Sequence, residues 1–152
     1  MTASVFVLLG DAIEARLRIS PAVATVIQRD RFRAIALDQA SAVVIKLDKT
    51  LGTRTGPAEG PTDWTTLYAV ECYARTTPSV LPSAAVDPIV RAVFERLSGD
   101  AASLGVDLGV EDLLPDPLIQ WDLDETAEGL GSAGISIRIV HRTQSAQLVA
   151  WT

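Results

Sequence analysis

Two β-strand patterns in this chain are separated by a segment far longer than a simple turn. The first pattern is AVVIKLDK, residues 42–49, and the second is WTTLYAVECYAR, residues 64–75. Both are rich in β-branched and aromatic residues, which favour strands. The segment between them contains three glycines and two prolines, whereas about two to five residues suffice to join antiparallel strands. We therefore expect a long hairpin arm with a mobile loop over 51–63, suited to assembly with further copies of the chain.

The rest of the chain predicts two helices and three further strands in a definite order. Apolar residues at helical spacing predict a helix before Ser20-Pro21, with Thr2 or Ser4 as its N-cap. Asp87-Pro88 is typical of a helix start, and Gly105 of a helix end. The expected order is a helix at 5–17, a strand at 23–27, a loop at 29–41, the hairpin strands, a helix from 87 to 104, and strands at 118–125 and 135–142. This order predicts a single α+β domain over 1–152, with two helices packed on one face of a mainly antiparallel sheet.

The alternation of side chains predicts which faces of these elements form the core. On strands, residues two apart share a face, and on helices residues three or four apart do so. The expected core includes one face of the second hairpin strand, one face of the last strand and a stripe on the second helix. Its members are Trp64, Tyr68, Val70, Cys72, Ile135, Ile137, Ile139, Ile89, Val90, Val93, Phe94, Leu97 and Leu104.

Composition and charge constrain the partners of the chain. The hydrophobic fraction is 48% and the mean hydropathy +0.26, which favours a protein that hides part of its surface against partners. The net charge is −6, but residues 1–54 carry a balance of +3 and residues 55–152 a balance of −9. A chain that grips DNA needs a basic face, so this distribution argues against that role. It suits head-to-tail contact between unlike surfaces, or simply a solvated acidic surface.

Cysteine content and hydropathy give further expectations. Cys72 is the only cysteine, so neither an internal disulfide nor a zinc cluster built on cysteines is expected. The apolar run VFVLLG near the N-terminus has six residues and no positive flank, so it resembles neither a signal peptide nor a membrane span. These features predict a protein of the reducing cytoplasm without a membrane partner.

Three groups of residues were weighed as chemical sites. Gly129, Gly131 and Gly134 match a dinucleotide-binding pattern, but a strand pattern follows where that motif requires a helix, so a flexible hairpin tip is the better interpretation. Asp122, Asp124 and Glu125 could bind a metal ion, although no second segment supplies ligands and a solvated strand face or an acid-lined ring interior fits as well. His141 and Cys72 lie in strand patterns, where a lone cysteine is usually a small core residue. We expect no enzyme, no cofactor and no metal.

With this order of elements, the chain resembles the tail terminator, or tail-completion, proteins of long-tailed bacteriophages and related particles. The resemblance covers most of the chain, from the first helix to Arg142. It is carried by the strand SAVVIKLDK, the long polar tip, the strand WTTLYAVECYA, the helix DPIVRAVFERL and the closing segment GISIRIVHRT. The C-terminal extension, residues 144–152, has no clear counterpart in that family.

The resemblance implies a structural virion protein at the head-proximal end of the tail, assembled in the host cytoplasm. It implies a homohexameric ring that caps the tail tube, stops polymerisation of the tube protein and joins the tail to a head-side connector, while double-stranded DNA passes through the lumen without specific binding. A neck or head-completion subunit is the alternative within structural proteins, and a small-molecule-binding enzyme is an alternative of another class. The expected interface residues are Arg29, Arg31, Arg33, Arg54, Thr55 and Glu59, and the expected channel or interface acids are Asp116, Asp122, Asp124, Glu125 and Glu128.

Overall fold

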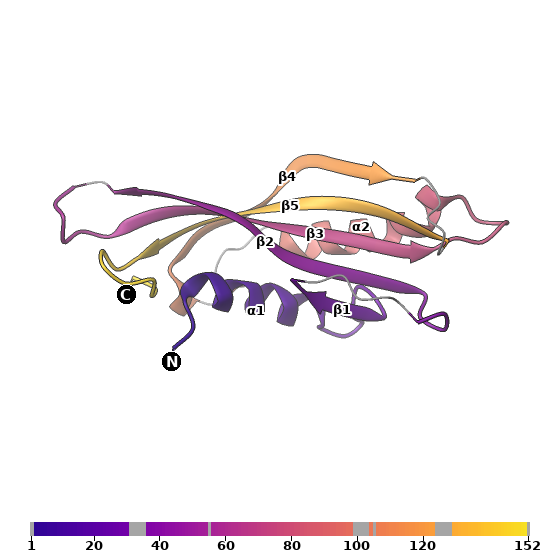
Figure 1. The fold of residues 1–152 in the computed structure, drawn as a ribbon, viewed down its shortest axis with the longest axis horizontal. Helices are drawn as coiled ribbons and strands as arrows, with labels where there is room; N and C mark the ends of the chain where they lie inside the picture. The colour runs from indigo at the N-terminus through magenta and orange to yellow at the C-terminus, as the bar shows by residue number, and fades with distance from the viewer. Residues whose placement is uncertain are drawn as a thin grey trace.

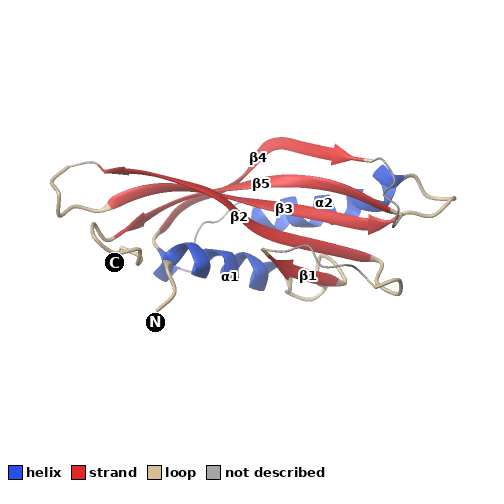
Figure 2. Ribbon diagram, viewed as in Figure 1, coloured by secondary structure: helices blue, strands red, loops and turns tan. Residues whose placement is uncertain are grey.

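The computed structural model describes residues 2–30, 36–54, 56–98, 104, 106–123 and 129–151. One five-stranded sheet runs the length of the molecule, with helices packed along it (Figures 1 and 2). The elements are α1 (Val5–Leu17), β1 (Val26–Arg29), β2 (Ser41–Arg54), β3 (Thr62–Arg75), α2 (Pro82–Leu97), the 3-10 turn η2 (Val106–Leu108), β4 (Val110–Asp122) and β5 (Leu130–Thr143). Their order agrees with the order predicted from the sequence.

The sheet has the strand order β1-β2-β3-β5-β4 and is mostly antiparallel. Only β1 and β2 pair in parallel, whereas the other three pairings are antiparallel. Both helices pack against the sheet and touch each other, and the Arg96 side chain donates hydrogen bonds to backbone carbonyls at the end of α1. The α+β fold is therefore confirmed. The face of the sheet that the helices cover is called the helix face below, and the opposite one the open face.

The core lies between the helices and the helix face of the sheet. In α1, Val5, Leu9, Ile13 and Leu17 recur every fourth residue and are fully buried. In β3 and β5, buried residues alternate with less buried ones, so the alternation of Tyr68, Val70 and Cys72 and of the three isoleucines is confirmed. Trp64 and Phe94 pack against this core but are only partly buried. Burial of these side chains drives the fold, at about 25 cal/mol per Å² of apolar surface.

The start and the end of α2 differ from the prediction. The helix begins at Pro82, with Leu81 as N-cap, so Asp87 is not the cap and Pro88 lies inside the helix. The buried stripe extends one turn upstream to Val86, and this burial offsets the hydrogen bond that Pro88 cannot donate. The helix ends at Leu97. Leu104 is buried in the core but lies outside the helix, and Gly105 is outside the described residues.

The hairpin strands run further into the arm than predicted. β2 continues to Arg54 and β3 begins at Thr62, and these two residues form the last pair of the ladder. The segment 51–63 is therefore not one loop, because its two ends belong to strands. Strand pairing reaches this far because Trp64 packs across Gly52: a Cβ on Gly52 would come within 2.7 Å of the indole ring. The mobility of the remaining tip stays a prediction.

The other strand boundaries also needed correction. β1 lies at Val26–Arg29 rather than at 23–27, and β4 begins at Val110 rather than at Leu118. β4 accommodates its prolines because it is an edge strand and because its register shifts between Pro115 and Ile119. Gly131 and Gly134 belong to β5, so the expected flexible glycine tip there is wrong. Gly129 alone of the three lies outside the strand, with a φ of 66°.

The contact between Gly52 and Trp64 leads to a prediction. Replacing Gly52 by alanine should destabilise the protein by about 1–3 kcal/mol, because the new methyl group overlaps an indole ring that cannot easily move. The ring stacks edge-on against Phe6, and its Nε1 donates a hydrogen bond to Thr143 Oγ1. Urea unfolding followed by circular dichroism measures the change. Gly134→Ala is the matched control, since a Cβ at Gly134 meets no atom within 4 Å; equal stability of both variants would contradict the packing described here.

Candidate protein interface

The arm formed by β2 and β3 projects beyond both helices (Figure 1). Its strand residues Leu47 and Leu51 are exposed although they are apolar, Leu51 by 73%. Arg54 and Glu59, two of the predicted interface residues, are exposed near its tip, and Thr55 is outside the described residues. The structure thus places part of the predicted set on the most projecting element of the subunit. Their role in an interface stays a prediction.

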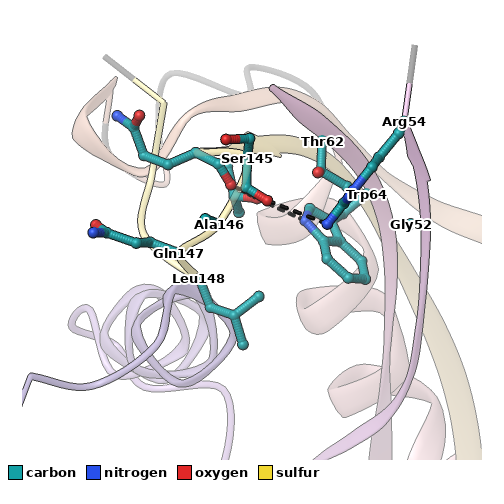
Figure 3. A pocket seen from close by; sticks show the side chains of 10 residues that line it. Gly52, Arg54, Thr62, Trp64, Ser145, Ala146, Gln147 and Leu148 are labelled. Carbon is teal, nitrogen blue, oxygen red and sulfur yellow. Dashed lines mark hydrogen bonds between the residues drawn. The ribbon is translucent and has the colours of Figure 1, made fainter. Parts of the chain in front are cut away.

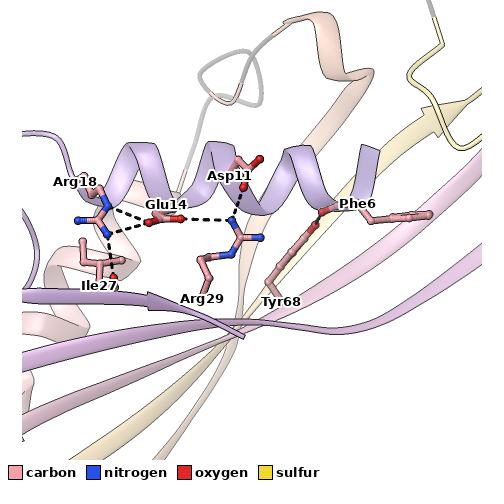
Figure 4. Close-up of polar contacts among 7 residues, drawn as sticks. All are labelled: Phe6, Asp11, Glu14, Arg18, Ile27, Arg29 and Tyr68. Carbon is pink, nitrogen blue, oxygen red and sulfur yellow. Dashed lines mark hydrogen bonds and ion pairs between the residues drawn. The ribbon is translucent and has the colours of Figure 1, made fainter. Parts of the chain in front are cut away.

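The base of the arm is held by contacts from both ends of the chain. The Trp64 ring meets Phe6 of α1 at 5.2 Å with an interplanar angle of 85°. Thr66 Oγ1 lies 2.7 Å from His141 Nε2 of β5. Tyr68 donates its hydroxyl hydrogen to the Phe6 carbonyl (Figure 4), and burial raises the pKa of the Tyr68 phenol well above its ordinary value. The arm is therefore anchored rigidly where it leaves the core.

The C-terminal segment, residues 144–151, folds back over this anchor. The amide of Val5 at the start of α1 donates a hydrogen bond to the Leu148 carbonyl, and that of Trp151 to the Arg142 carbonyl. A helix start leaves backbone N–H groups without intrahelical partners, so Leu148 satisfies one of them where Ser4 offers no side-chain cap. The C-terminal segment and the arm line an open hollow of about 380 Å³, into which Arg54 reaches with a contact of 3.4 Å to the Ser145 carbonyl (Figure 3). Sequence analysis left this segment without a role.

The arginine cluster predicted at 29–33 is described only in part. Arg29 Nη1 lies 2.7 Å from Asp11 and 3.5 Å from Glu14 of α1 (Figure 4). Its guanidinium lies against Gly10, where a Cβ would come within 2.3 Å of it. These contacts within the subunit join β1 to α1, and a role of Arg29 in an interface stays a prediction. Arg31 and Arg33 lie outside the described residues.

The open face of the sheet carries most of the polar strand residues. Lys46 and Glu71 form an ion pair at 3.0 Å, and the hydroxyl of Tyr73 donates to Glu71 at 2.8 Å. Burial and the adjacent Glu71 raise the pKa of Tyr73. Of the predicted acids, Asp122 is exposed at the end of β4 and Asp116 is half-buried in the same strand; Asp124, Glu125 and Glu128 are outside the described residues. The two acids that lie within the described residues are therefore both on β4.

The residues weighed for catalysis lie in the core and apart from each other. Cys72 pairs with Ala133 and His141 with Trp64, at different heights of the sheet. Burial raises the pKa of the Cys72 thiol to about 12 and lowers that of His141 to about 4, so near neutrality the thiol stays protonated and the neutral imidazole is only a weak base. Among the described residues, no three His, Cys, Asp or Glu side chains group closely enough to hold a metal ion.

The described α-helices, α1 and α2, have 13 and 16 residues. Neither α1 nor α2 is long and apolar enough to cross a membrane.

Comparison with known proteins gives likeness in structure only. No family model and no curated protein matches the chain. A chain in the virion of a native gene transfer agent particle has a TM-score of 0.60 and 14% identity, with 89% of this chain and 95% of that chain covered. A chain in the PVC sheath/tube terminator of an extracellular contractile injection system, in its extended state, has a TM-score of 0.48 and 10% identity, with 100% of this chain and 62% of that chain covered.

The first of these likenesses establishes a shared fold with a virion component. At 14% identity, this likeness concerns the fold alone. The TM-score of 0.48 is too low to assign the same fold to the second chain. One structure is described as a virion and the other as a sheath/tube terminator.

Proposed function

We propose that this protein is a structural component of a virion tail, and that it forms a homohexameric ring that caps the tail tube. In this role it stops polymerisation of the tube protein and joins the tail to a head-side connector. The observation that carries the proposal is the long arm, whose exposed apolar residues and anchored base suit contact with neighbouring subunits. The fold shared with a virion chain supports it. The number six comes from the resemblance to tail terminators.

The charge distribution supports this role. A ring at the end of a tube must let DNA pass, and a negative lumen repels the DNA backbone whereas a basic one holds it. We propose that Asp116 and Asp122, with Asp124, Glu125 and Glu128, face the lumen or a basic surface on the next ring. DNA then passes without specific binding. The protein would act in the virion, at the head-proximal end of the tail, after assembly in the host cytoplasm.

The proposal predicts that the purified protein stops the growth of tail tubes. Tube protein polymerising with an excess of the protein should give shorter tubes, each with a ring at one end in negative-stain microscopy. Arg54→Glu, which reverses an exposed charge on the arm, should weaken this effect. Arg91→Glu is the matched control, because Arg91 is exposed on α2, away from the arm.

Two results would overturn the proposal. One is tube growth that is unaffected by the protein, with no density added to the tube ends. The other is microscopy of whole particles that finds a different protein at the head-proximal end of the tube; the location of this chain in the neck instead would favour a head-completion subunit.

A further inference from the structure

The sheet has two open edges. In the part of the chain that the structure describes, β1 covers the outer side of β2 only from Ala42 to Ile45, which leaves β2 as an edge strand from Lys46 to Arg54. This stretch is called the arm edge. At the other side of the sheet, β4 pairs only with β5. Within the described residues, no backbone hydrogen bond from another segment reaches the outer side of either stretch. Unpaired edges of this kind readily accept a further strand.

The two edges lie at the same height along the sheet. The strand register connects Lys49 on one edge with Leu114 on the other, and Leu51 with Asp112. One row across the sheet is Lys49, Leu67, Arg138 and Leu114, and another is Leu51, Thr65, Val140 and Asp112. Pro115 lacks a backbone N–H and stands at a register shift. The edge of β4 at this height is therefore Val110–Leu114, called the acidic edge; it contains a second register shift, between Val110 and Asp112, and pairs regularly with β5 from Asp112 to Leu114.

The side chains of the two edges are complementary. The arm edge carries Lys46, Lys49 and Arg54 against one acid, Asp48. The acidic edge carries Glu111 and Asp112, both exposed, and no basic residue. Each edge also exposes a leucine, Leu51 by 73% and Leu114 by 44%. An edge that is basic and apolar fits one that is acidic and apolar, whereas two like edges would repel each other.

The strand directions fit a head-to-tail contact. β2 is antiparallel to β3, β3 to β5, and β5 to β4, so β4 runs opposite to β2. A second copy placed beside β4 in the same orientation would present its own β2 antiparallel to β4. The alternation of the sheet would continue from one copy to the next. Contacts between unlike patches of identical subunits close into rings when the rotation allows it.

We propose that the acidic edge of one copy pairs antiparallel with the arm edge of the next, so that a single β-sheet continues around the ring. Asp112 would lie on the same face as Lys49 of the neighbour, and Leu114 beside its Leu51, within the reach of cross-strand neighbours. This inference rests on the self-assembly in the proposed function and names the surfaces that carry it.

Disulfide trapping tests the pairing directly. Assembled protein that carries Lys49→Cys together with Asp112→Cys or Leu114→Cys should, on oxidation, give a ladder of covalent oligomers that reaches the size of the closed ring on non-reducing gels. The pair Lys49→Cys and Arg91→Cys is the matched control, since Arg91 is also exposed but lies on α2. Native Cys72 is buried and does not interfere. The absence of a ladder from both edge pairs, or an equal ladder from the control, would overturn the pairing.

A charge exchange gives a second, independent test. Lys49→Asp alone and Asp112→Lys alone should each weaken self-association about tenfold, because like charges then meet across the contact. The double variant should recover most of the loss, as measured by analytical ultracentrifugation over a concentration series. Additive losses in the double variant would overturn the pairing. The two proposals can fail separately. If rings cap the tubes but the edge cysteines do not cross-link, the pairing of the edges is overturned and the proposed function stands. If the edge cysteines cross-link into rings that never bind a tube end, the proposed function is overturned and the pairing stands.

Discussion

Replacement of Val93 by aspartate is expected to prevent the protein from folding stably. Val93 is fully buried in the middle of α2, within the main core cluster. A carboxylate placed there has no partner and must either lose its hydration or take up a proton. The cost is on the order of 3–5 kcal/mol, a large part of the roughly 5–15 kcal/mol by which domains are stable.

Thermal unfolding of the soluble fraction measures this effect. For a chain of this length, 1 kcal/mol corresponds to about 2–4 °C in Tm, so we expect Tm to fall by about 10 °C or more if any soluble protein is obtained. Ala84→Asp is the matched control, because it introduces the same side chain at an exposed position of the same helix and should change stability by no more than about 0.5 kcal/mol. Unchanged melting of Val93→Asp would mean that this face of α2 does not pack on the sheet.

Acid is expected to destabilise the protein through His141. The imidazole is fully buried beside the ring of Phe6, its Nε2 faces Thr66, and its Nδ1 has no hydrogen-bond partner among the described residues. An imidazolium must donate from both nitrogens, so burial favours the neutral ring and lowers the pKa of His141 from 6.5 to about 4.

The sign of the pH effect follows from this lowered pKa. Between pH 6.5 and pH 4, the unfolded chain binds a proton at His141 that the folded chain does not bind. Stability is therefore fully present above pH 6.5 and falls as the pH is lowered through this window, by about 3 kcal/mol in total. Carboxylates titrate mainly below about pH 5, so the interval from pH 7 to pH 5 reports chiefly on His141.

Urea unfolding over this interval, compared between the wild type and His141→Gln, measures the effect. The variant keeps polar atoms near Thr66 but cannot titrate. Its free energy of unfolding should therefore fall by about 2 kcal/mol less than that of the wild type between pH 7 and pH 5. Proton NMR provides a direct check, because His141 is the only histidine of the chain. A ring titration with a midpoint near pH 6.5 in the folded protein would contradict the prediction.

Local patterns predicted most of the elements and failed where the neighbours of an element decided its limits. Side-chain alternation located β3 and β5, since a strand with one face on a core must bury every second residue. The Asp87-Pro88 pair looked like a helix start, but the buried Val86 draws the helix back to Pro82. Likewise, the prolines of β4 looked like a connection, yet an edge strand tolerates them.

The candidate interface was predictable in outline only. The arm followed from its glycine- and proline-rich tip, and the head-to-tail tendency from the opposite charge balance of the two parts of the chain. Lys49, Leu51, Asp112 and Leu114 were missed, because nothing in the sequence shows that residues 49 and 114 stand in one row of the sheet. The role of residues 144–151 was missed too, since their contacts are backbone hydrogen bonds to Val5 and Arg142 that leave no side-chain signal.

The sequence by itself determined the α+β class, the order of the elements and the buried faces of α2, β3 and β5, because hydrophobic periodicity acts over a few neighbouring residues. Only the tertiary structure decided the strand order, the parallel pairing of β1 with β2, the far end of the arm and the two edges left open. These features depend on contacts between residues distant in the chain. A segment such as Thr50–Arg54 becomes a strand because β3 and the Trp64 ring lie beside it, although its own residues favour a loop.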